Sequence, residues 1–243
     1  MSQAKKAPRA DGYWALALKN VRDPKMLAFA SLIIALRVAV KAFRIPLAAG
    51  LSLNFDCYIN ALGSVVYGPL AALLVGAASD TLGCMLFPSG PYFPPFALVE
   101  MSSGFIFGCM LWRRRLTVNR VLAAKFLVNL VCNIVLTSLF MKWNYYVMYG
   151  LEKAEAYTII NLVRIGKNLV LFPLEAMLIT LVLQAAAPIL ARMHLPQVDA
   201  GLLKLEKKHY ILLAALLAAS AALVLLYING GAEFIKNHNI KGL

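Results

Sequence analysis

The sequence has few charged residues. Only 14% of its 243 residues are Asp, Glu, Lys or Arg, whereas 61% are hydrophobic and the mean hydropathy is +0.74. Soluble domains carry roughly 25% charged and about 45–50% apolar residues, so the composition excludes a water-soluble globule. We expect an all-α membrane protein, because the chain has room for roughly six or seven helical spans of about 20 apolar residues and for no sizeable soluble domain.

Motifs of enzymes that bind phosphate or metal are missing as well. The chain has no G-x-x-x-x-G-K-[ST] sequence, so we expect it not to hydrolyse ATP through a phosphate-binding loop. It also lacks H-E-x-x-H, and its three histidines fall in polar segments: His194, His209 and His238. The four cysteines show no C-x-x-C spacing, which disfavours a zinc site or a disulfide framework. We therefore expect neither an enzyme nor a bound metal or cofactor.

Seven apolar stretches divide the chain. They cover residues 26–43, 51–67, 70–87, 96–112, 121–141, 157–190 and 210–228. We expect the first six to form a six-helix transmembrane bundle over 26–190, and the seventh to be an additional C-terminal transmembrane helix over 210–229. The other expected segments are a cytoplasmic N-terminal segment (1–25), a basic cytoplasmic linker (191–209) and a short tail (230–243).

Basic residues are concentrated in alternate connections. Segments 113–120 and 192–208 are rich in Lys and Arg, whereas 88–95 and 142–156 are poor in them. Because positive residues gather on the cytoplasmic side, this pattern predicts a multi-pass protein of the cell membrane with a cytoplasmic N-terminus. Topology then explains the net charge of +13, with lipid as the surroundings and without a nucleic-acid partner.

Ionisable residues interrupt the apolar stretches at six positions: Arg37, Asp80, Glu100, Arg164, Lys167 and Glu175. An ionised side chain is costly against lipid, so each should face the bundle interior, a partner or water. One interpretation is structural pairing, for instance of Asp80 with Arg164 or Lys167. The other is a binding site, since Arg164 and Lys167 share one helix face near the outer surface and together suit an anion.

Aromatic residues crowd the same outer level. They are Phe55, Tyr58, Phe87, Tyr92, Phe93, Phe96, Trp143, Tyr145 and Tyr146. Two interpretations remain open, a belt at the membrane interface and the wall of a pocket. The proline-rich run 88–95 favours the pocket, because irregular backbone at that depth is tolerated only where it packs on protein or lines a cavity. We predict that this run forms a lid.

Small residues recur at every fourth position in three of the stretches. Ser31, Ala35 and Ala39 form a smooth stripe, and the pairs Ala72/Gly76 and Gly104/Gly108 have the same spacing. This spacing lets helices approach closely. Taken alone, each set favours packing within the bundle.

Three neighbouring segments carry a more specific pattern: I-N-A-L-G-S-V-V-Y-G-P-L (59–70), V-G-A-A-S-D-T-L-G (75–83) and L-F-P-S-G-P-Y-F-P-P-F (86–96). They resemble the membrane-embedded substrate-binding subunits, or S-components, of energy-coupling factor (ECF) transporters, specifically the folate family. The run R-I-G-K-N (164–168), with Pro173 and Glu175, resembles the last helix common to that family. The resemblance covers roughly residues 26–187.

The resemblance implies a six-helix bundle that binds a vitamin near its outer face and topples in the membrane to release it inside. It also implies partners: a membrane coupling subunit and two ATP-binding cassette ATPases that hydrolyse the ATP. The stripe Ser31, Ala35 and Ala39 corresponds to the surface that docks on the coupling subunit. The residues that the motif places in the pocket or its support are Asn60, Asp80, Tyr92, Phe93, Phe96, Arg164 and Lys167.

The chain departs from the family pattern at two places, and both add acid near the expected pocket. Residues 97–100 read Ala-Leu-Val-Glu where the family has a Ser/Thr-rich entry, and residues 56–58 read Asp-Cys-Tyr in place of an apolar stretch. Glu100 therefore joins the predicted substrate-binding residues. Folate carries two carboxylates, and like charges in a low-dielectric cavity repel strongly. The added acidic residues therefore disfavour binding of a ligand such as folate next to them.

Two ligand classes and two other functions stay open at this point. The first ligand is folate or a related heterocyclic acid, with its ring on the aromatics and its carboxylates on Arg164 or Lys167. The second is an amine-bearing vitamin paired with Asp56 or Glu100. An intramembrane enzyme would use Asp80 and Glu100 as its two carboxylates, and a structural scaffold would bind no small molecule.

Overall fold

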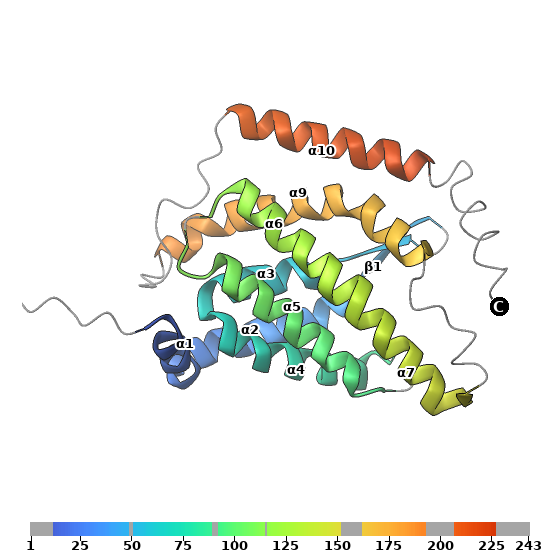
Figure 1. The fold of residues 1–243 in the computed structure, drawn as a ribbon. Coiled ribbons are helices and arrows are strands. Elements are labelled where there is room, and N and C mark those ends of the chain that lie inside the picture. Colours follow the sequence, from blue (N-terminus) through green and yellow to red (C-terminus); the bar gives the residue numbers. More distant parts are fainter. Residues whose placement is uncertain are drawn as a thin grey trace, which may run out of the picture.

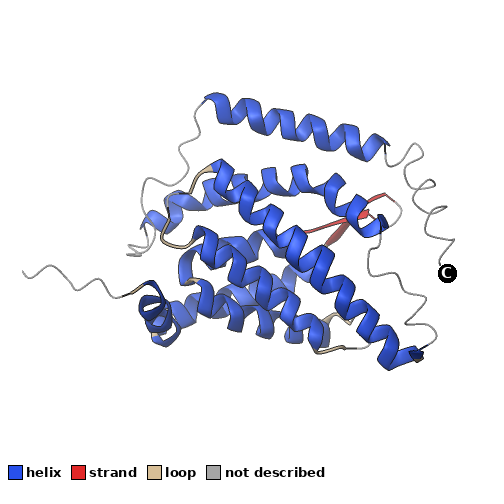
Figure 2. Ribbon diagram, viewed as in Figure 1, coloured by secondary structure: helices blue, strands red, loops and turns tan. Residues whose placement is uncertain are grey.

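The computed structural model describes residues 12–48, 51–88, 92–114, 116–151, 162–192 and 207–226. They form a bundle of helices with one short hairpin of strands (Figures 1 and 2). In chain order the elements are α1 (Tyr13–Arg22), α2 (Pro24–Lys41), β1 (Arg44–Ala48), β2 (Leu51–Asn54), α3 (Asp56–Tyr67), α4 (Pro69–Leu86), α5 (Pro95–Leu111), α6 (Val118–Val128), η1 (Asn129–Leu136), α7 (Thr137–Tyr149), α9 (Leu162–Arg192) and α10 (Lys207–Leu226).

The expected helical membrane architecture is confirmed. Among the described residues, three helices are long and apolar enough to cross a membrane: Pro69–Leu86, Val118–Tyr149 and Arg164–Leu190. The second of these is continuous through α6, the π-helical segment η1 and α7. The additional C-terminal helix is present as α10, which packs along α9 on one side of the bundle (Figure 1).

The apolar stretch 51–67 is not one helix, as the sequence had suggested. Its first residues form β2, which pairs antiparallel with β1, and only the 12 residues of α3 are helical. The run Leu-Ser-Leu-Asn at 51–54 alternates apolar and polar residues, which suits a strand. Asp56 then stands in the first turn of α3, where a carboxylate favours the start of a helix.

The helix α1 lies in the segment expected to be only a cytoplasmic N-terminal extension. It packs on the ends of α3 and α5: Asn20 donates a hydrogen bond to the carbonyl of Tyr67 (3.2 Å), and the Tyr13 hydroxyl donates to that of Gly108 (3.4 Å). Asp23 ends α1 and caps α2 by accepting a hydrogen bond from the backbone N–H of Lys25 (3.0 Å). Figure 1 shows α1 and β1 at opposite ends of the bundle.

Small residues bring α4 and α5 into close contact, which confirms the packing expected of Ala72/Gly76 and Gly104/Gly108. A Cβ added to Gly76 would lie 2.8 Å from the backbone of Glu100, and one added to Gly104 would lie 2.9 Å from the carbonyl oxygen of Ala72. The two helices therefore touch backbone to backbone, and this contact fixes the position of Glu100 on α5.

Candidate binding site

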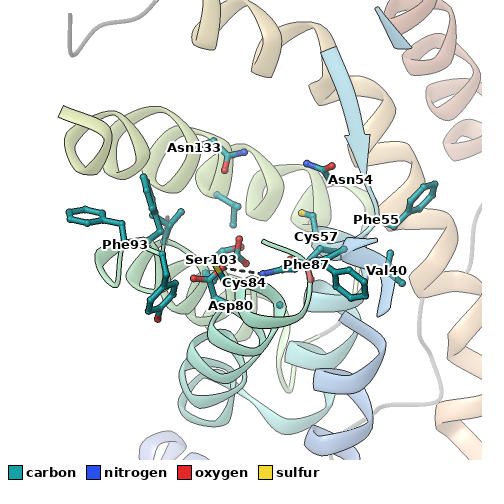
Figure 3. A pocket seen from close by; sticks show the side chains of 18 of the residues that line it. Val40, Asn54, Phe55, Cys57, Asp80, Cys84, Phe87, Phe93, Ser103 and Asn133 are labelled. Carbon is teal, nitrogen blue, oxygen red and sulfur yellow. Dashed lines mark hydrogen bonds and ion pairs between the residues drawn. The ribbon is translucent and has the colours of Figure 1, made fainter. Parts of the chain in front are cut away.

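A cavity of about 560 Å³ lies where α4 ends and α5 begins. Side chains from α2, α3, α4, α5, α6, η1, α7 and α9 line it, together with Tyr92 and Phe93 just before α5. Figure 3 shows Asp80 and Ser103 near the centre of the cavity, with Phe93 on one side and Phe55 on the other. A volume of this size falls within the range of about 300–1,000 Å³ that small-molecule sites occupy.

Five of the eight predicted substrate-binding residues line this one cavity: Asp80, Tyr92, Phe93, Phe96 and Glu100. The other three, Asn60, Arg164 and Lys167, do not line it. Residues 89–91 of the predicted lid lie outside the described residues.

Arg37 is the centre of the charged network beside the cavity. Its side chain is fully buried, and it binds both oxygens of Asp56, through Nε to Oδ1 and Nη2 to Oδ2, each at 2.8 Å. Its Nη2 also donates to Oε2 of Glu100 at 2.6 Å. One guanidinium on α2 thus holds a carboxylate on α3 and another on α5. This is the two-pronged geometry for which Arg is suited.

Asn60 adds two hydrogen bonds to this network. Its Oδ1 accepts a hydrogen bond from Nη1 of Arg37 (3.4 Å), and its Nδ2 donates to Oγ of Ser103 (3.1 Å). Asn60 is buried, so both of its polar ends are satisfied within the protein. It helps to orient Arg37. Its connection to the cavity is the hydrogen bond to Ser103, which lines the cavity.

Asp80 has a partner other than the two considered from sequence. Among the described residues its ion-pair partner is Lys41 on α2, with Nζ to Oδ1 at 3.1 Å, and neither Arg164 nor Lys167. Lys41 also donates to the backbone carbonyl of Ser79 (3.3 Å). The sequence could not indicate this pair, because it depends on α2 packing against α4.

Lys125 is a site residue that the sequence analysis missed. Its side chain is only 1% exposed, pairs with Glu175 on α9 (2.9 Å) and donates a hydrogen bond to Sγ of Cys57 (3.4 Å). All three residues line the cavity. The available signal was this single Lys inside the apolar stretch 121–141, where an ionised side chain is as costly against lipid as the six ionisable residues named from the sequence.

Acid exceeds base around the cavity. Among the described residues, four lining carboxylates face three paired cations: Asp56, Asp80, Glu100 and Glu175 against Arg37, Lys41 and Lys125. Asp80 and Glu175 each have a Lys of their own, whereas Asp56 and Glu100 share Arg37. With every group ionised, the site has one surplus negative charge, shared by Asp56 and Glu100.

Aromatic rings form one wall of the site. Phe93 meets Phe96 edge to face with ring centroids 5.5 Å apart, and meets Trp143 in the same way at 5.6 Å. The Tyr92 hydroxyl lies 3.0 Å from Oγ1 of Thr81 on α4. These contacts hold the rings in place, and such a wall suits a flat aromatic ligand.

Asparagines link the cavity to α9. Asn133, which lines the cavity from η1, donates to Oδ1 of Asn168 at 3.0 Å and to Oδ1 of Asn129 at 3.1 Å. Asn168 in turn donates to the backbone carbonyl of Arg164, one turn earlier (2.9 Å), and Arg164 donates to Oγ of Ser138 (3.5 Å). Arg164 is therefore connected to the lining residue Asn133 through Asn168, and Lys167 precedes Asn168 on α9.

The predicted docking stripe lies on the other face of α2. Ser31, Ala35 and Ala39 are all exposed, and Ser31 satisfies its hydroxyl by bonding back to the carbonyl of Leu27 (3.0 Å). Arg37 is two residues from both alanines, which places it on the opposite side of the helix. One helix thus presents a smooth outer surface and an inner cation that contacts the site.

Metal ligation finds no support in the described part of the chain. No group of three or more His, Cys, Asp or Glu side chains there is arranged to hold a metal ion. The cysteines Cys57, Cys84, Cys109 and Cys132 are free thiols.

Comparison with known proteins gives three findings. A family model described as "ECF-type riboflavin transporter, S component" matches residues 22–188. The folate transporter FolT of Clostridium novyi (strain NT) is 31% identical over 119 residues, which are 49% of this chain and 64% of that protein. FolT of Leuconostoc mesenteroides is 29% identical over 126 residues, which are 51% of this chain and 66% of that protein. The chain thus matches slightly less than two thirds of each of these relatives.

A solved structure extends the likeness to the fold. The crystal structure of FolT bound with folic acid is 29% identical in sequence and superposes with a TM-score of 0.53, over 64% of this chain and 90% of that one. The family model is named for riboflavin, whereas these relatives are named for folate. The comparisons therefore agree on the kind of protein and differ on the vitamin.

Proposed function

The chain belongs to the S-component family of ECF-type transporters, and on that premise we propose that it is the membrane-embedded vitamin-binding subunit of such an importer. It captures folate or a related heterocyclic acid at the outer face of the cell membrane. The observation that carries this proposal is the cavity, which combines an aromatic wall with ion-paired polar side chains. The FolT relative that binds folic acid shares this fold.

The ligand would lie with its ring system against Phe93 and Phe96. The charged network of Arg37, Asp56 and Glu100 would meet the edge of the ring. Arg164 and Lys167 would bind the carboxylates of the ligand's tail. What supports this is the position of both residues next to or one turn from Asn168 on α9, which accepts a hydrogen bond from the cavity-lining Asn133.

Transport requires partners that supply the ATPase. We infer a membrane coupling subunit and two ATP-binding cassette ATPases, with Ser31, Ala35 and Ala39 as the docking stripe, because these residues are exposed and smooth. Docking on α2 would topple the bundle and release the vitamin inside. The N-terminus would be cytoplasmic: Lys19, Arg22 and Lys25 on α1 and α2 stand at the same end as Arg113 and Arg114 after α5.

A second candidate is an amine-bearing vitamin. The surplus negative charge of the cavity favours it, since a cationic ligand would neutralise the Asp56–Glu100 pair. Riboflavin is the third ligand to compare, because the family model carries its name.

The test is to identify what leaves with the protein. The full chain, expressed in a vitamin-replete host and purified in detergent, is denatured, and the released small molecules are identified by mass spectrometry. We expect a folate-type compound. A matched preparation of Phe96→Ala, which loses part of the aromatic wall, should carry less of it. Recovery of a flavin or of an amine-bearing vitamin instead would overturn the folate assignment.

A further inference from the structure

We propose that Glu100 determines ligand specificity by accepting hydrogen bonds from an amino-substituted pyrimidine edge, which distinguishes folates from flavins. The inference rests on the proposed function and names the part of the ligand that the acidic side of the cavity recognises. It assigns a role to the surplus negative charge, which neither the fold nor the aromatic wall explains.

Glu100 shares its cation, Arg37, with Asp56 and receives fewer hydrogen bonds from it than Asp56 does. Arg37 gives two hydrogen bonds to Asp56 and only one to Glu100. The other oxygen of Glu100, Oε1, accepts no hydrogen bond from any residue in the described part of the chain. Asp80 and Glu175 differ, because each is matched to its own Lys.

Glu100 is also the most accessible of the four acids. Its side chain is 29% exposed, compared with 14% for Asp56, 18% for Asp80 and 13% for Glu175. It lines the cavity, so its free oxygen is available to a ligand there. Asn144 presents a second buried acceptor at the same cavity, since its Oδ1 has no partner among the described residues. The cavity therefore offers acceptors that need donors.

The position of Glu100 suits the edge of a stacked ring. Phe96 precedes it by four residues on α5, so both side chains project from one face of the helix. The close contact of its backbone with Gly76 fixes the position of Glu100 relative to α4. A flat ligand that packs against Phe96 would direct its edge at the carboxylate.

Folate and riboflavin present opposite edges to a carboxylate. The pterin ring of folate carries adjacent donors, the ring N3–H and the 2-amino group, which can donate to the free Oε1 of Glu100 and to the remaining lone pair of Oε2. The corresponding edge of a flavin carries one N–H between two carbonyls, whose oxygens would face the carboxylate oxygens. A buried acceptor that gains donors is stabilised, and one that meets another acceptor is left unpaired.

The test measures affinity and discrimination together, by calorimetry on the full chain in detergent. The probes are folic acid, an analogue in which hydrogen replaces the 2-amino group, and riboflavin. In the unmodified protein folic acid should bind at least roughly tenfold more tightly than the analogue. Glu100→Gln should lose roughly tenfold to a hundredfold in folic acid affinity, the range typical of one charge-assisted hydrogen bond. The preference over the analogue should fall towards one, and riboflavin should bind no more weakly than before.

Two controls separate recognition from structure. Asp23→Asn removes a carboxylate that caps the far end of α2 and does not line the cavity, while its amide oxygen can still accept from Lys25, so its folic acid to analogue ratio should stay at the unmodified value. Thermal unfolding of Glu100→Gln should occur at or above the normal temperature, because the surplus charge is gone while Asp56 still holds Arg37. A purely structural role for Glu100 predicts a lower unfolding temperature and an unchanged ratio.

The failures are distinguishable. Equal binding of folic acid and the analogue by the unmodified protein overturns the inference without any variant. An unchanged ratio in Glu100→Gln overturns it while the folate assignment stands. Binding of riboflavin and not of folic acid overturns both.

Discussion

Arg37 is the residue of the site that pairs with two carboxylates at once. It connects α2 to carboxylates on α3 and α5, and it has no exposure of its own. We predict that Arg37→Met lowers the stability by about 3–5 kcal/mol, the usual cost of breaking a buried pair and leaving its partners uncompensated. Thermal or denaturant unfolding in detergent measures this. Adding Glu100→Gln to Arg37→Met should recover part of the loss, and a single variant as stable as the original would contradict the network.

Lys125 and Glu175 provide an independent pair for a double-mutant cycle. Lys125→Met should destabilise the protein strongly, because it leaves the carboxylate of Glu175 without its cation. The Glu175 side chain is only 13% exposed, so water can compensate little of the lost ion pair. Lys125→Met combined with Glu175→Gln should be closer to the original than either single variant. Additive losses in the unfolding free energy would show that the two residues do not interact.

Sequence reasoning at this scale identified which residues are costly and not how they pair. Arg37, Asp80, Glu100 and Glu175 were singled out because an apolar stretch does not tolerate charge. Their partners Lys41, Asp56 and Lys125 come from other helices, so the pairs depend on which helices are neighbours. That information is absent from any local pattern.

At the scale of elements, the contact between α4 and α5 positions the acidic side of the cavity. Gly76→Leu has no space against the backbone of Glu100, so we predict that it destabilises the protein by about 1–3 kcal/mol through overpacking. By shifting α5 it should also weaken ligand binding. Unfolding and calorimetry of the same preparation measure both effects.

A matched control is Ala123→Leu, which adds a larger side chain at an exposed position on α6. It should leave both quantities near their original values. If Gly76→Leu behaved like this control, the close packing of α4 on α5 would not be what places Glu100.

Hydrophobic patterning in the sequence predicts some of the secondary-structure elements and not others. Spans with long apolar runs, such as α4 and α5, were located to within a residue or two. The hairpin of β1 and β2 was missed because hydrophobicity alone does not separate a short strand from a helix, although the alternation at 51–54 was visible. The π-helical turn η1, which aims Asn133 at the cavity, depends on backbone geometry that composition does not encode.

At the scale of the whole molecule, α2 is the helix that would connect vitamin capture to delivery. α2 presents Ala35 outward and Arg37 inward, so in the proposed function docking and ligand binding would use opposite faces of one helix. We predict that Ala35→Arg abolishes vitamin uptake by cells that carry the complete transporter, while binding by the isolated subunit stays unchanged. Uptake assays and calorimetry on the same variant measure the two outcomes.

Ala123→Arg serves as the control for this experiment, because it places the same side chain at an exposed position on another helix. It should affect uptake much less. Normal uptake by Ala35→Arg would remove the stripe on α2 from the docking surface.

In the proposed function this chain binds a folate in the cavity where α4 ends and α5 begins. The most direct measurement is a calorimetric titration of the full chain in detergent with folic acid and, separately, with riboflavin. We expect one folic acid site with a dissociation constant below micromolar and weaker binding of riboflavin. Tighter binding of riboflavin, or no binding of either compound, would contradict it.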